Sequence, residues 1–485
     1  ARWLFAGNPA KVEALDETTV RFTFPVPTPG LLNRFAVDYG QPFLPRHIFA
    51  PFMDAHGDGA AALRAQHGFA SETEAVNFYY GASDWKDVPS PLLGRTSDRV
   101  VPTLEAYIVV EETTERRHLV ANPYFHMVDT QGQQLPYIEE IAESYVPDAQ
   151  VRNLMLTRGS IDYKAQGLLI EDYPLFKDNE AAGDYRVLLA DALGELITYN
   201  FNTTHPDTAY RAVFSDVRFK RAMSLAIDRA EINELIYLGQ GQPQQAVPFE
   251  PKTVSFIDPT ITQAYVDHDP NRAAALLDEA GLVDTNGDGY RELPGGGQFV
   301  VQIVYAGSEV PVALHELVRD YWEQVGVATR IREVSVERYR QDANNNALDV
   351  LIQVRSSLGP KSLANPETIY PPFGNPFGPG TGFAWAVWKS TDGQQGVEPP
   401  ADIQRLWDLA DRFRLHALGS AESNAIGSEI VAIHLDNMLR IGIVGNVRSP
   451  IVVSNRLMNV PTFTAKAYDY YWAYPFRPFQ WSFAH

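Results

Sequence analysis

The sequence predicts a large α/β protein with two or three domains, and three observations lead to this fold class. The chain has 485 residues, more than one hydrophobic core usually organises. Hydrophobic residues make up 45% of the chain, which is enough for packed cores. From about residue 203 to residue 440, apolar runs typical of strands alternate with segments of helical spacing, a pattern typical of α/β architectures.

The first two hundred residues predict strands, turns and short helices. Residues 1–95 combine an alternating strand at 20–24 with proline-rich turns and a helical stretch near 58–67. Residues 96–200 contain strand-like runs at 106–111 and 138–146. This part of the chain is therefore expected to be α+β.

The segment 199–239 is the most informative part of the sequence. It predicts a short apolar strand joined to one long helix through a polar crossover at 201–206. Asp216 is the expected N-cap, apolar residues between Phe219 and Ile227 share one helical face, and Gly239 follows the last apolar residue as a stop signal.

The remaining predicted elements continue the alternation towards the C-terminus. They are a strand at 299–305, a helix at 312–325, a strand at 329–336, helices at 402–416 and 421–435, and a strand at 439–444. The first three form a βαβ unit. An aromatic-rich segment closes the chain, and we expect most of its rings to pack in a core.

The order of parts in 199–239 resembles family 5 extracellular solute-binding proteins, the receptors of peptide and oligosaccharide ABC importers. The resemblance rests on an Asn-containing strand followed by SDVRFKRAMSLAIDR and a glycine, and residues 12–28 and 269–292 extend it over nearly the whole chain. It implies a two-lobed, type II, three-domain periplasmic-binding-protein-like fold. Crossover strands would join the lobes, with the ligand cleft between them and closure by hinge motion.

The resemblance also implies a domain organisation. Residues 1–95 would be the remainder of an extra small domain beside lobe I, 96–202 lobe I, 203–440 lobe II, and 441–485 a return to lobe I. The start of this chain resembles a segment that lies well inside family members. We therefore expect that the chain is truncated at its N-terminus and that the signal peptide is missing. A monomer in the periplasm or outside the cell follows from the family, and a lipid anchor on the missing N-terminus is compatible with it.

Composition excludes several other classes of protein. The chain has no cysteine, which removes disulfides, thiolate catalysis and cysteine-ligated metals. A formal charge of −20 disfavours nucleic acid as a partner. No run of about 18 apolar residues suggests a membrane span.

Enzyme signatures fail in this sequence, so we expect no catalytic residues and no cofactor. His315-Glu316 lacks a second histidine at helical spacing, and Gly239-Gln240-Gly241 lacks the third glycine of a phosphate cradle. Two alternatives to the importer receptor stay open. They are a secreted, glycosidase-like hydrolase built on a carboxylate pair, and a sensory or cell-wall binding module.

A candidate cation loop begins at Asp284. Asp284, Asn286 and Asp288 occupy the first, third and fifth positions of a calcium loop, but Gly295 stands where the bidentate glutamate belongs. The sequence therefore favours an Asp/Gly turn over a metal site.

The expected ligand contacts lie in lobe II. Trp385 and Trp388 follow a Gly/Pro-rich segment, where a loop could present indole faces to a sugar. Asn202 ends the crossover strand. In the segment QVRSSLGPKSLANPETIY, the polar contacts would be Arg355, Asn365 and Glu367.

This same segment departs from the peptide-binding members of the family. Those members place an Asp shortly after the strand at 348–353 to hold the peptide ammonium, and no Asp stands here. A buried ammonium needs a counter-charge. Glu367 could supply it, so the sequence favours an oligosaccharide slightly over a peptide.

Overall fold

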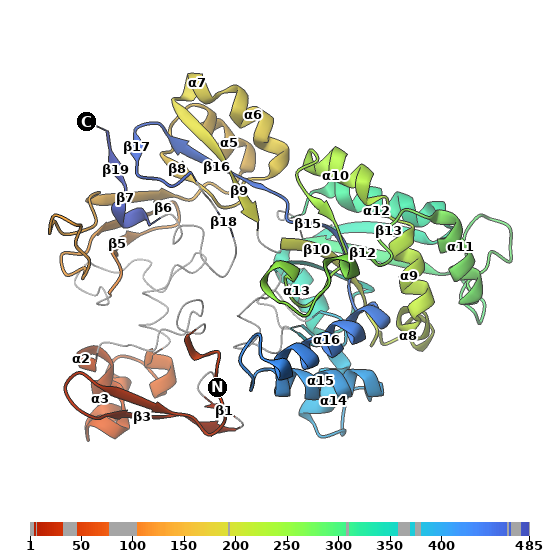
Figure 1. The fold of residues 1–485 in the computed structure, drawn as a ribbon, viewed down its shortest axis with the longest axis horizontal. Helices are drawn as coiled ribbons and strands as arrows, with labels where there is room; N and C mark the ends of the chain where they lie inside the picture. Colours follow the sequence, from red (N-terminus) through yellow and green to blue (C-terminus); the bar gives the residue numbers. More distant parts are fainter. Residues whose placement is uncertain are drawn as a thin grey trace. The chain divides into compact units, whose positions relative to one another are not determined.

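The computed structural model (Figure 1) divides the chain into two compact units. It describes residues 4–5, 7–32, 46–76, 104–192, 195–306, 310–356, 369–373, 380–462, 465–466 and 477–484. Unit 1 consists of residues 1–40, 191–449 and 465–469, and unit 2 of residues 41–190, 450–464 and 470–485.

The main elements of unit 1 mix helices with strands. They are β1 (Leu4–Phe5), β2 (Asn8–Pro9), β3 (Lys11–Ala14), β4 (Val20–Thr23), β10 (Glu195–Phe201), α8 (Thr208–Ser215), α9 (Val217–Leu225), α10 (Arg229–Tyr237), β11 (Gln242–Pro243), α11 (Pro270–Glu279), β12 (Val300–Ala306), α12 (Val312–Gln324), β13 (Ala328–Val334), α13 (Val336–Asn344), β14 (Val350–Ser356), α14 (Phe383–Ser390), α15 (Ala401–Phe413), α16 (Ala421–Asp436), β15 (Ile441–Gly445) and β18 (Ala465–Lys466).

The elements of unit 2 come from both halves of the sequence. They are α2 (Arg46–Phe49), α3 (Ala60–Gln66), β5 (Tyr107–Glu112), β6 (Arg116–Ala121), β7 (Glu140–Ser144), α5 (Ala149–Thr157), β8 (Tyr163–Lys164), α6 (Tyr173–Asp178), α7 (Glu180–Gly183), β9 (Tyr185–Ala192), β16 (Ser449–Ser454), β17 (Leu457–Met458) and β19 (Ser482–Phe483), with β9 running across the boundary at 190/191.

The boundary between the units differs from the predicted one. The chain passes from unit 2 to unit 1 at 190/191 and back at 449/450, where the sequence analysis placed 202/203 and 440/441. The predicted crossover at 201–206 lies inside unit 1, because β10 pairs antiparallel with β14 along its whole length. Residues 1–95 are divided as well, since residues 1–40 group with unit 1.

A four-stranded sheet with the order β11-β15-β10-β14 organises unit 1. One of its two ends lies close in sequence to the points where the chain passes between the units. At one end, Leu196 of β10 pairs with Gly445 of β15 and Arg355 of β14, close to both chain crossings at 190/191 and 449/450. We call this the crossover end. Phe201 and Ile441 mark the opposite end, about 20 Å away at ~3.4 Å per residue over the seven residues of β10.

The predicted βαβ unit is confirmed, and the predicted long helix is two helices. Strands β12 and β13 are parallel and α12 connects them. Asp216 caps α9 as expected, because its carboxylate accepts a hydrogen bond from the Arg218 amide. The helix then breaks, because Asp228 caps α10 by accepting from the Glu231 amide.

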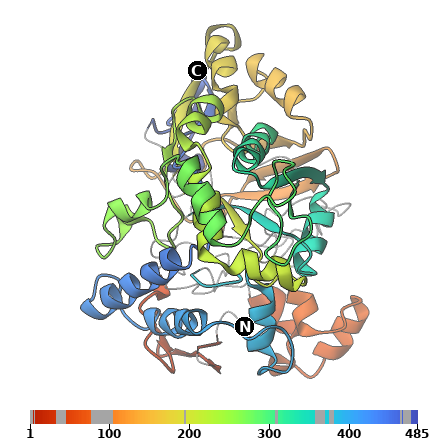
Figure 2. The same cartoon turned by 90° about the vertical axis from the view of Figure 1, so that its right-hand side faces the viewer.

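Two of the cores in the described part of unit 1 are rich in aromatic rings. An aromatic cluster beneath the sheet contains Phe201, Phe214, Phe219 and Phe299, with ring centroids 4.8–6.3 Å apart. A second core lies around α14, α15 and α16 and includes Trp385, Trp407 and Ile430. Helices α15 and α16 lie side by side in both views (Figures 1 and 2).

Unit 2 is built from segments far apart in the sequence. Strand β16 lies between β9 and β8 in one sheet, and its Val452 pairs with Lys164. Near the C-terminus, Trp481 packs against Tyr163 with a ring-centroid distance of 4.5 Å. At these described residues, the end of the chain therefore packs with a segment from the first half of the sequence.

Candidate functional site

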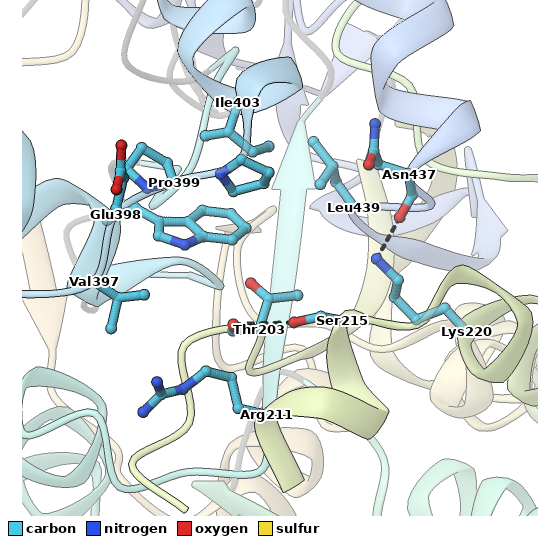
Figure 3. A pocket seen from close by; sticks show the side chains of 12 residues that line it. Thr203, Arg211, Ser215, Lys220, Val397, Glu398, Pro399, Ile403, Asn437 and Leu439 are labelled. Carbon is cyan, nitrogen blue, oxygen red and sulfur yellow. Dashed lines mark hydrogen bonds between the residues drawn. The ribbon is translucent and has the colours of Figure 1, made fainter. Parts of the chain in front are cut away.

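A cavity of about 440 Å³ lies in unit 1, at the end of the sheet opposite the crossover end (Figure 3). It forms where the segment after β10, helices α8, α9 and α14, the start of α15 and the segment before β15 meet. Its lining comprises Thr203, Arg211, Ser215, Lys220, Trp385, Val397, Glu398, Pro399, Pro400, Ile403, Asn437 and Leu439.

The cavity has a buried floor and an exposed mouth. Side chains with very little exposure form the floor, and they include Lys220 at 4%, Leu439 at 3% and Ile403 at 1%. Ser215 and Glu398 are exposed and lie at the mouth. Any ligand would pass from a polar rim to a mostly apolar interior.

Lys220 is a buried cation without a carboxylate partner. Its ammonium donates to the backbone carbonyl of Asn437, just past the end of α16 (Figure 3). No carboxylate of the described residues lies within ion-pair distance of the Lys220 ammonium. Asp216, at the start of the same helix, is paired with Arg218 at 2.6 Å instead. Burial lowers the pKa of the Lys220 ammonium to about 8.

Arg211 supplies a second cation to the lining. Its Nε donates to the carbonyl of His205 at 2.7 Å and its Nη2 to that of Pro206 at 3.2 Å. Both partners are neutral. With Glu398 as the one acid, the lining carries two positive charges and one negative charge, in a chain whose formal charge is −20.

Trp385 lies on a helix rather than on the loop predicted for it. The spacing of the aromatic residues in FAWAVW fits α14, which begins after Gly382. Gly382 is required there because it has φ 82° and a Cβ atom would lie 2.6 Å from the Trp385 ring. The indole is 5% exposed and belongs to the core around α14 to α16.

The indole N–H of Trp385 distinguishes it from the purely structural tryptophans. Trp322 donates to the Met223 carbonyl at 3.0 Å and Trp407 to the Pro371 carbonyl at 3.1 Å. Trp385 makes no such bond to any described residue, so its donor is free for a ligand. Trp388 is half-buried beside the turn at Gly393 and does not line the cavity.

Asn202 is fully engaged within the protein. Its amide donates to the Leu348 carbonyl at 2.9 Å and to Asn346 Oδ1 at 3.1 Å, while its Oδ1 accepts from the Thr204 amide at 3.1 Å. These bonds pin the segment after β10 to the segment before β14.

The other predicted contacts do not join Trp385. Arg355 stands opposite Leu196 at the crossover end of the sheet, about 20 Å along β10 from Asn202. Asn365 and Glu367 lie outside the described residues. Of the predicted contacts that the structure describes, Trp385 alone lines the cavity.

The Asp284 loop forms the predicted turn. Asp284, Asp288 and Glu292 are close enough to share an ion, but their carboxylates accept hydrogen bonds within the turn. Asp284 accepts from the amides of Gly287 at 2.7 Å and Gly289 at 2.9 Å.

Sequence reasoning missed Lys220 and Arg211. A signal for Lys220 was present, because it precedes the fully buried Met223 by three residues and Ile227 by seven, which places it on their helical face. Arg211 gave no signal, since its position depends on backbone carbonyls outside its own helix.

The fold is that of transporter-associated binding proteins. "Oligopeptide-binding protein OppA" is 28% identical with a TM-score of 0.65, and the match covers 98% of this chain and 75% of that one. The periplasmic binding protein MelB from Agrobacterium fabrum, solved with stachyose, is 19% identical with a TM-score of 0.66, covering 99% and 68%. NikZ from Campylobacter jejuni, solved with Ni(L-His), is 16% identical with a TM-score of 0.68, covering 98% and 78%.

A profile described as "Bacterial extracellular solute-binding proteins, family 5 Middle" matches residues 1–377. The chain belongs to this family of transport binding proteins, which are not enzymes. The periplasmic alpha-galactoside-binding protein of Rhizobium meliloti is 24% identical over 70% of this chain. A probable ABC transporter-binding protein of Deinococcus radiodurans is 23% identical over 74%.

The chain spans about half the length of these curated relatives, 49% of the first and 55% of the second. Among the residues that the structure describes, no helix is both long and apolar enough to cross a membrane.

Proposed function

We propose that this chain is the extracytoplasmic receptor of an ABC-type importer, which captures a short oligosaccharide or oligopeptide and delivers it to a membrane permease. The family match over residues 1–377 carries the proposal. We expect a monomer that acts in the periplasm or outside the cell. Ligand recovered unchanged after incubation with the protein would agree with a binding role, and released products would favour the hydrolase alternative.

An oligosaccharide is the preferred ligand class in this proposal. The segment after β14 lacks the Asp that would hold a peptide ammonium. Among relatives, one is named for alpha-galactosides and one was solved with stachyose. OppA, named for oligopeptides, supports the other class.

The crossover end of the unit 1 sheet is the proposed place of ligand contact. Arg355 stands at this end, and Asn365 and Glu367 follow it in the chain. Binding by these residues relies on hydrogen bonds from a guanidinium and an amide to hydroxyl groups, with no need for a buried counter-charge.

Calorimetry with stachyose, raffinose and a set of tri- to pentapeptides tests this proposal. We expect α-galactosides to bind and Arg355→Met to weaken them about tenfold, the loss of roughly one good polar contact. Arg330→Met, at an exposed position on β13, is the matched control and should change the affinity less than twofold. Binding of peptides alone, abolished by Glu367→Gln, would reverse the ligand preference.

A further inference from the structure

We propose that the cavity at the end of the sheet away from the crossover end is a second ligand site, which binds a small organic carboxylate through the ammonium of Lys220. This inference does not depend on which solute the receptor transports. It rests on the position of the cavity, the charges in its lining and the donors left without partners.

The position of the cavity separates it from the proposed transport site. All of its lining residues lie between Thr203 and Leu439, inside unit 1. Thr203 lies two residues after the end of β10, whereas Arg355 pairs with Leu196 near its start. The length of β10, about 20 Å, therefore lies between the two along the sheet.

The charge of Lys220 requires a partner that the described protein does not supply. An ammonium has three N–H donors, and one of them is used by the Asn437 carbonyl. Burying a cation without an anion is costly. The charges that act most on Lys220 are Asp216, already paired with Arg218, and Arg221, which adds to the positive field. A ligand carboxylate would supply the missing negative charge.

The hydrogen-bonding groups of the lining also fit a carboxylate. An ionised carboxylate only accepts hydrogen bonds, and two donors of the lining are available away from Glu398, the acid at the mouth. They are the ammonium of Lys220 and the free indole N–H of Trp385. Arg211, half-buried in the lining, adds a guanidinium whose partners are two neutral carbonyls.

The rest of the cavity fits the body of a small organic ligand, because Ile403 and Leu439 offer apolar walls (Figure 3). The nearby hydroxyls are held within the protein, since that of Ser215 donates to the Thr203 carbonyl at 3.3 Å and that of Thr203 lies 2.9 Å from the Thr381 hydroxyl. A volume of about 440 Å³ falls at the small end of the range for binding pockets. The ligand class is therefore a carboxylate on a compact ring or short chain.

Calorimetry with matched charged and neutral probes tests the site. The pairs are D-galacturonate with D-galactose, and benzoate with benzyl alcohol, which differ in the carboxylate. We expect at least one carboxylate to bind at least tenfold more tightly than its neutral match. Lys220→Met should reduce its affinity at least tenfold, and Lys252→Met, at an exposed lysine elsewhere in unit 1, should change it less than twofold.

The pH dependence of wild-type binding provides a test that needs no variant. Above a pKa of about 8 the Lys220 ammonium loses its charge, while the ligand carboxylate stays ionised. Carboxylate affinity should therefore fall about tenfold or more between pH 7 and pH 9.5. The pKa of the nearby Asp216 carboxyl is lowered by its hydrogen bonds with Arg218, so this acid stays charged throughout the range.

Three results would overturn the proposal. They are equal affinity for a carboxylate and its neutral match, unchanged carboxylate binding in a folded Lys220→Met protein, and constant affinity from pH 7 to pH 9.5. Measuring whether the Lys220→Met protein still binds the transported solute distinguishes failure of the second-site proposal from failure of the receptor proposal. If transport-ligand binding persists while carboxylate binding is lost, both proposals hold.

Discussion

Acid should destabilise unit 1 through His315, a histidine buried in its core. His315 is 0% exposed, and its Nδ1 lies 2.7 Å from the hydroxyl of Tyr199. Its Nε2 is buried without a hydrogen-bond partner among the described residues. Burial lowers the pKa of this imidazole from 6.5 to about 4. The folded protein therefore keeps His315 neutral at a pH where the unfolded chain protonates it.

The sign and size of the effect follow from these two pKa values. Because the folded-state pKa is lowered, the contribution to stability is complete above pH 6.5 and is lost as the pH falls towards 4. At about 1.4 kcal/mol per pKa unit, His315 should cost roughly 2 kcal/mol of unfolding free energy at pH 5 and about 3 kcal/mol at pH 4.

Urea unfolding of wild type and His315→Asn, at intervals from pH 7 to pH 4, measures this contribution. Asparagine keeps an acceptor near the position of Nδ1 for the Tyr199 hydroxyl but does not titrate. All other titrating groups are common to both proteins, so the difference between their pH profiles belongs to residue 315. If the two pH profiles stay parallel within about 0.5 kcal/mol, the assignment of acid destabilisation to His315 is wrong, because substitutions that disturb no specific interaction change stability by about that much.

Three further predictions concern stability. Phe219→Ala should cost about 3–5 kcal/mol in urea unfolding, because the ring is 0% exposed and lies 4.8 Å from that of Phe201. Leu235→Ala, at a side chain that is 61% exposed, should cost less than about 0.5 kcal/mol, and similar losses for both would count against the core assignment. Gly396→Ala should lower the melting temperature more than Gly287→Ala, since both have positive φ but only at Gly396 would a Cβ atom meet a backbone oxygen at 2.3 Å. Chelator and millimolar calcium should both leave the melting temperature unchanged, because the Asp284 carboxylate is already bound by turn amides; a rise of several degrees with calcium would show a metal site.

Local signals in the sequence predicted most of the elements in unit 1. The helix at 421–435 is observed at Ala421–Asp436, and the strand at 299–305 at Val300–Ala306. These segments combine clear caps or turns with the periodicity of one element type, so neighbouring residues determine the outcome. The break between α9 and α10 was missed because the apolar stripe continues across Asp228, whose role as a cap competes with helix continuation.

The candidate site was much less predictable than the fold. Trp385 was selected for its chemistry, but its place beside Lys220 depends on segments that are distant in the sequence. Nothing local distinguishes an asparagine that binds a ligand from one that, like Asn202, satisfies neighbouring carbonyls. For both Trp385 and Asn202, the role depends on which distant segments pack beside the residue, and a single sequence does not show this.

The position of β16 has a consequence for how the chain folds as it is synthesised. Unit 1 is nearly contiguous, so most of its contacts can form once residue 449 has been made. The sheet of unit 2 needs β16 between β9 and β8, and so its first strands must wait for more than half of the chain to follow. During that interval the edges of β8 and β9 are unpaired, and such edges are prone to pair with other chains. A late segment therefore completes a sheet whose other strands were translated much earlier, and ribosome-bound intermediates should be most vulnerable to proteases in unit 2.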